Sequence, residues 1–151
     1  MPMLKEIAEL EEGRVLLTGN AKRLARIYLN AWIRRGKTLL VEYLPFQVDG
    51  EVYIGSPLEG GDFDAYLIVN PLSRPKSERE KLYSWLGEGG NKLVLLYEQK
   101  YVKDSIVRYP IKEFIDYLIA YKRETVGFER IDVMRFERGR VVAEKSYVRR
   151  Y

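Results

Sequence analysis

The chain has 151 residues, of which 46% are hydrophobic and 32% charged, as expected for a single soluble globular domain (1–151) rather than a disordered protein. It contains no cysteine and no histidine, which excludes disulfides, thiolate metal sites, cysteine nucleophiles and histidine acid–base relays. Its formal net charge of +4 comes from the C-terminal end: residues 121–151 hold nine Lys/Arg against five Asp/Glu, whereas residues 1–120 hold 17 of each sign.

The hydropathy pattern predicts a protein that stays in the cytoplasm, away from membranes. No segment approaches the ~20 consecutive apolar residues that a membrane-spanning helix needs. The first twelve residues, MPMLKEIAELEE, include four glutamates and lack the apolar core of a secretory signal.

The first part of the chain alternates helical and strand patterns. Residues 3–12 predict a short amphipathic helix, and residues 14–18 form an apolar run typical of a strand covered on both faces. Residues 21–35 predict a second helix, and residues 37–43 a second buried strand. The apolar stripe expected on that second helix consists of Leu24, Ile27, Tyr28, Ala31 and Trp32.

The middle of the chain continues this alternation. A short strand is expected at 51–54 within an irregular segment, 45–61, that is rich in turn signals. A buried strand follows at 64–70, then a helix at 75–86 that begins with a proline, and then a strand at 92–97.

The last third is predicted with one open alternative. Residues 111–121 have a helical apolar stripe, although the same apolar density could be partly strand. Residues 130–136 and 140–147 read as two strands of a hairpin joined at 137–139. Strands that alternate with helices indicate an α/β fold with a mostly parallel sheet, helices on both faces and an antiparallel hairpin at one edge.

Several of these segments, in this order, resemble the RecA-type ATPase core, in particular its RadA/KaiC-like branch. The resemblance spans about residues 13–147. It is carried by LLTG (16–19), RRG (34–36), TLLVEYL (38–44), DAYLIVNPLS (64–73) and IDVMRFERGRVV (131–142). The resemblance implies a three-layer RecA-like fold in which residues 64–70 correspond to the Walker B strand.

The parts of that family's machinery that hydrolyse ATP are missing. A phosphate loop needs GxxxxGK[ST], whereas Gly19 and Asn20 lead almost directly into the next helix, and Lys22 is followed by Arg23 rather than Ser or Thr. Asn70 occupies the Walker B position and lacks the negative charge that holds a hydrated metal ion. We therefore expect no ATPase activity, no cofactor and no metal.

Two groups of residues could still bind a ligand, and each of them also has a simpler structural interpretation. The degenerate nucleotide or anion site comprises Gly19, Asn20, Lys22, Arg23 and Asn70. Its bases flank the start of a helix, where free N–H groups attract anions. The plainer interpretation is that Asn20 caps that helix and that Asn70-Pro71 is an ordinary end of a strand. The acidic pair Asp62 and Asp64 is interpreted as exposed loop charge.

The second candidate is a nucleic-acid contact on the C-terminal hairpin. Arginines interleaved with aromatic residues can bind phosphates and stack on bases. Acidic residues alternate with these arginines, so cross-strand ion pairs are the competing interpretation. The candidate contacts are Arg135, Arg138, Arg140, Lys145, Arg149 and Arg150.

Three functional hypotheses follow. The leading one is a non-catalytic domain that acts through a protein partner or through self-association, with Tyr43, Phe46 and Tyr53 as a possible partner surface. The alternative is a nucleic-acid-binding accessory protein that uses the basic hairpin. The third is a sensor of nucleotides or other small molecules at Gly19 and Asn70.

Overall fold

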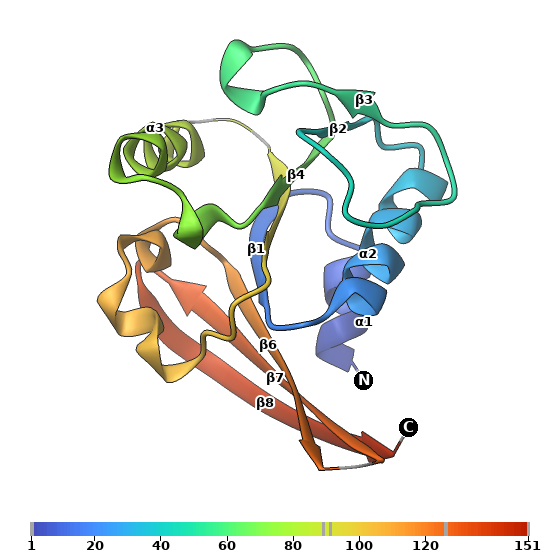
Figure 1. The fold of residues 1–151 in the computed structure, drawn as a ribbon, viewed down its shortest axis with the longest axis vertical. Helices are drawn as coiled ribbons and strands as arrows, with labels where there is room; N and C mark the ends of the chain where they lie inside the picture. The colour runs from blue at the N-terminus through green and yellow to red at the C-terminus, as the bar shows by residue number, and fades with distance from the viewer. Residues whose placement is uncertain (1, 89, 91, 126, 151) are drawn as a thin grey trace.

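In the computed structural model, which describes residues 2–88, 90, 92–125 and 127–150, eight strands form one sheet in the order β3-β2-β4-β5-β1-β6-β7-β8 (Figure 1). The first six strands run parallel, and β7 and β8 add an antiparallel hairpin at one edge. The predicted α/β fold, with its mostly parallel sheet and terminal hairpin, is confirmed. The strands are β1 (Gly13–Thr18), β2 (Leu39–Val41), β3 (Tyr53–Ile54), β4 (Ala65–Val69), β5 (Leu93–Glu98), β6 (Tyr117–Thr125), β7 (Phe128–Glu137) and β8 (Arg140–Arg150).

The sheet is covered on both faces along its central strands. In β1, Val15 and Leu17 pack into the apolar cluster on one face, and Leu16 packs into the cluster on the other. Every residue of β4 and β5 is buried. Their continuous apolar runs therefore reflect two covered faces rather than the alternation of a half-exposed strand.

Helices α1 (Pro2–Ala8) and α2 (Lys22–Arg34) lie on one face of the sheet (Figure 1). The other face is covered by α3 (Lys76–Gly87) and by two 3-10 segments, Asp104–Arg108 and Pro110–Glu113. Helix α1 ends four residues before its predicted end. No helix in the described part of the chain is long and apolar enough to cross a membrane.

The buried stripe of α2 is rotated relative to the predicted one. Ile27 is 44% exposed, whereas Leu29, outside the predicted stripe, is completely buried. The side chain of Trp32 packs toward α1, where its Nε1 donates a hydrogen bond to the Ile7 carbonyl at 3.2 Å. The buried residues of α2 are Leu24, Ala25, Tyr28, Leu29, Asn30 and Trp32.

The helix predicted at 111–121 is not formed, and the alternative that this segment is partly strand is confirmed. Pro110–Glu113 is a single 3-10 turn, and β6 begins at Tyr117, parallel to β1 and opposite Val15. A stripe of apolar residues does not distinguish a buried strand from a helix. Because β1 lies inside the sheet, its second edge must be hydrogen-bonded, and β6 provides those partners.

The hairpin that closes the chain is built on a two-residue turn. Arg138 and Gly139 both have positive φ, 50° and 78°, which is the geometry of a type I′ turn between β7 and β8. Strand β8 is the last in the sheet and has β7 as its only neighbour among the described residues.

Candidate functional site

The connection from β1 to α2 is a direct turn of three residues, 19–21. The Gly19 amide donates to the Glu98 carbonyl at 3.0 Å, which ties the turn to the end of β5. Gly19 has a φ of +101°, and a Cβ there would lie only 2.2 Å from the carbonyl oxygen of Tyr121 in β6. The turn is therefore packed tightly between the ends of its two neighbouring strands.

The N-terminus of α2 is held by a hydroxyl from the protein itself. The Ala21 amide donates to Tyr97 Oη at 3.2 Å and also contacts the Gly19 carbonyl at 2.9 Å. Burial raises the pKa of Tyr97, so the phenol stays neutral. Within the described residues α2 has no side-chain N-cap, so the interpretation of Asn20 as a capping residue was wrong.

Asn70 forms a separate structure at the end of β4. It adopts a left-handed conformation, with φ 51° and ψ 56°. Its Oδ1 accepts from the Gln99 amide at 3.0 Å, and its Nδ2 donates to Gln99 Oε1 at 3.2 Å. Because β5 lies between β4 and β1, Asn70 and Gly19 are about two strand spacings apart, or roughly 10 Å.

Glu98 is a polar residue of this edge that sequence reasoning missed. It is buried, with 1% of its surface exposed, and ends β5. Its carboxylate accepts from the Leu72 amide at 2.8 Å and from Ser73 Oγ at 3.0 Å. The signal available in the sequence is a single acid that directly follows an apolar run. Leu72 and Ser73, which hold its carboxylate, lie 26 and 25 residues away along the chain.

A pocket of about 240 Å³ lies beside the start of α2 and brings together residues from both predicted sites. Lys22 and Arg23 line it from α2, Arg123 from β6, and Arg149 from β8. Its one buried acid, Glu129, accepts hydrogen bonds from Tyr121 Oη at 2.5 Å and from Arg149 Nε. Burial opposes ionisation of Glu129, but these two hydrogen bonds, together with the charges of Arg149 and Arg23, hold its pKa below the usual range. The pocket therefore carries an excess of positive charge at a helix N-terminus.

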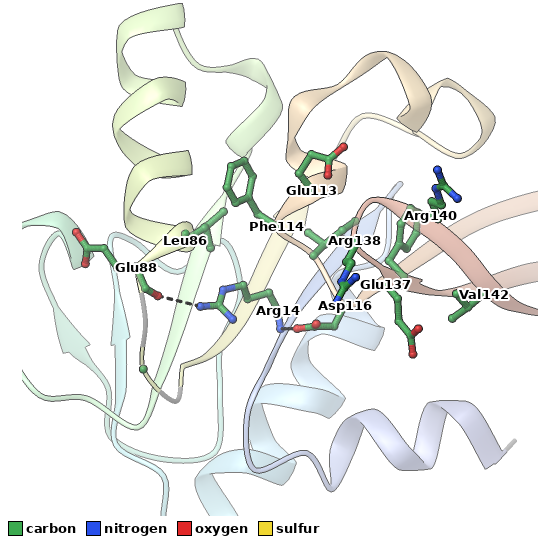
Figure 2. A pocket seen from close by; sticks show the side chains of 14 residues that line it. Arg14, Leu86, Glu88, Glu113, Phe114, Asp116, Glu137, Arg138, Arg140 and Val142 are labelled. Atoms are coloured by element: carbon green, nitrogen blue, oxygen red, sulfur yellow. Dashed lines mark hydrogen bonds between the residues drawn. The ribbon is translucent and has the colours of Figure 1, made fainter.

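The remaining hairpin bases do not join this pocket. Arg138 follows the end of β7 and lies nine positions from Glu129, a distance of about 30 Å along the extended strand. Arg138 and Arg140 line an open cleft of about 1140 Å³ at the opposite end of the hairpin (Figure 2). Lys145 is exposed on β8, opposite Val133.

The cleft carries charges of both signs. Figure 2 shows Arg138 and Arg140 among carboxylates, and the acids that line the cleft are Glu88, Glu113, Asp116 and Glu137. At its floor the Arg14 amide donates to Asp116 Oδ2 at 2.8 Å, and Arg14 Nη2 donates to the Glu88 carbonyl at 3.4 Å. This end of the hairpin therefore lacks the excess of positive charge that favours phosphate binding.

The last two of the six hairpin bases, Arg135 and Arg150, each lie next to side chains of neighbouring residues. Arg135 lines a smaller cavity of about 430 Å³ with Leu10 and Tyr117, and Arg150 lies over the Phe128 ring at 5.6 Å. The six predicted nucleic-acid contacts therefore do not form one continuous surface. The predicted cross-strand ion pairing does occur between Arg149 and Glu129.

The acidic pair predicted at Asp62 and Asp64 lies on the surface. Asp62 and Asp64 are both exposed, and Asp64 Oδ2 accepts from the Thr38 amide at 2.9 Å. Across the residues that the structure describes, no three acids come close enough to hold a metal ion.

No protein-family model matches the chain, and the search of curated proteins found no match.

Proposed function

We propose that this chain is a non-catalytic RecA-like domain of the RadA/KaiC-like branch, with the family's three-layer core, that acts by binding another protein. The observation that supports this proposal best is the β1–α2 turn. In a phosphate loop the backbone amides at the helix start face the anion. Here the Ala21 amide is bonded to Tyr97 Oη, and Gly19 is packed against the Tyr121 carbonyl.

Exposed apolar side chains at both edges of the sheet support the protein-binding half of the proposal. At the β3 edge Tyr43 is 50% exposed and Tyr53 53%, whereas Phe46 packs against Tyr97 and the core. At the β8 edge Val148 is 62% exposed. Apolar groups concentrated at free sheet edges are typical of surfaces that bind another chain.

Two measurements test the two halves of the proposal. The first is phosphate release from Mg-ATP by purified protein, which should equal the blank. The second places a photo-crosslinking phenylalanine analogue at Val148 or at Tyr53 in cells that produce the protein, with Glu80 on the exposed side of α3 as the control. We expect a covalent protein adduct from an edge position and none from Glu80. Turnover above the blank, or adducts from neither edge, would refute the corresponding half.

The basic pocket favours nucleic-acid binding as a second candidate. It places Lys22 and Arg23 beside Arg149, so positive charge from the hairpin and from the α2 N-terminus converges. Phosphate contacts of this kind give binding that weakens steeply with salt.

A matched pair of charge reversals tests this second function. Lys22→Glu with Arg23→Glu removes charge at the pocket, and Arg138→Glu with Arg140→Glu makes the same net change at the mixed cleft. If the pocket binds nucleic acid, only the first variant loses affinity for a labelled single-stranded oligonucleotide at low salt. The slope of log affinity against log salt should then become shallower by the amount expected for about two lost phosphate contacts. Equal loss from both variants would show that net charge alone drives the binding.

A further inference from the structure

Among the residues that the structure describes, no strand pairs with the outer edge of β8. Strand β8 is 11 residues long and contains no proline, whereas β3 at the opposite edge has only two residues. In an antiparallel pair, alternate N–H and C=O groups of each strand point away from the partner. Strand β8 therefore presents a long row of free hydrogen-bonding groups, and such a row is a template for another strand.

The side chains of β8 indicate the charge of a strand that would pair with its free edge. The strand has four basic residues and one acid, which gives it a net charge of +3. Lys145 and Arg149 lie on the same face, four residues apart, because they are opposite Val133 and Glu129. A neighbouring strand with carboxylates at the same spacing would place opposite charges directly across the new ladder.

The same charges disfavour a second copy of this chain. Closed pairing of two β8 strands requires a two-fold axis, so one residue must lie opposite its own copy. When Lys145 lies on that axis, it faces Lys145 of the other chain, and Arg140 faces Arg150. Every other register still brings together two strands of net charge +3.

From this edge we infer that β8 binds an extended acidic strand of another protein, which extends the sheet beyond β8. The inference rests on the proposed protein-binding function and names the chemistry of the partner. Its apolar part would be β-branched or aromatic side chains that cover Val141 and Val148, which are 46% and 62% exposed. Its acidic part would lie opposite Lys145, since Arg149 is already paired with Glu129 within the domain.

A charge-reversed copy of β8 provides a defined probe. The labelled peptide EVVAKESYVEE keeps the length and β-propensity of β8 but reverses each charge, and the native peptide RVVAEKSYVRR is its matched control. We expect the first peptide to bind the full chain at least about tenfold more tightly than the second, with affinity that falls as salt rises. Bound peptide should slow amide hydrogen exchange in β8.

Two protein variants separate local pairing from overall charge. Lys145→Glu should weaken binding of the acidic peptide about fivefold or more, since a favourable cross-strand pair becomes a repulsive one. Lys81→Glu, which makes the same change on an exposed position of α3, should leave the affinity unchanged.

Three results would overturn the inference: equal affinity for the two peptides, no binding of either, or binding without protection of β8. The photo-crosslinking experiment separates this failure from failure of the proposed function. If the peptide test fails while adducts still form at Tyr53, only the acidic-strand inference falls.

Discussion

Replacing Tyr97 with phenylalanine tests how the β1–α2 turn is held closed. The substitution keeps the buried ring and removes the hydroxyl that accepts the Ala21 amide at 3.2 Å. A buried donor without its acceptor costs about 1–3 kcal/mol. Because the Ala21 amide also contacts the Gly19 carbonyl, we expect the lower part of this range, about 1–2 kcal/mol.

The measurement is the free energy of unfolding from urea titrations, followed by circular dichroism at pH 7. A chain of this size loses about 2–4 °C of melting temperature for each kcal/mol, so thermal unfolding gives a second estimate. Tyr53→Phe is the matched control, because the Tyr53 side chain is 53% exposed, and surface substitutions usually change stability by less than about 0.5 kcal/mol. A loss below about 0.5 kcal/mol for Tyr97→Phe would refute the idea that this hydroxyl holds the turn.

Three further predictions concern single positions. Gly19→Ala should destabilise the fold by more than about 2 kcal/mol in urea titration, since the new Cβ would meet the Tyr121 carbonyl at 2.2 Å; wild-type stability would contradict the tight turn. Burial and a hydrogen bond to a carboxylate raise the pKa of Tyr117 to about 12, so the folded state keeps its proton after the unfolded chain has lost it. Stability should thus fall as pH rises from about 10 toward 12, and Tyr117→Phe should flatten that fall in guanidinium titrations. Asn70→Ala should cost about 1–3 kcal/mol from left-handed strain and lost bonds to Gln99, whereas an unchanged unfolding midpoint would show that the β4 end is held elsewhere.

Local pattern in the sequence was enough to predict much of the architecture. Strands β1, β4 and β5 are continuous apolar runs, and α2 has helical periodicity. Helix α3 was predicted from the proline at its start and the glycines at its end. The hairpin follows from a two-residue turn in which Gly139 takes the second left-handed position. Each of these features depends on neighbours within a few residues, so the order of residues determines it directly.

Tertiary structure decided the features on which the candidate site depends. β6 is a strand that pairs with the second edge of β1, although its own sequence does not exclude a helix. The contact from Tyr97 to Ala21 joins residues 76 positions apart, and Arg149 reaches the same pocket as Lys22 from the far end of the chain. The order of residues in the sequence does not tell how far apart such distant residues lie in space. The packing of the sheet determines these distances. The same packing separates Arg138 and Arg140 from Arg149, although the sequence analysis predicted that all three belong to one nucleic-acid contact.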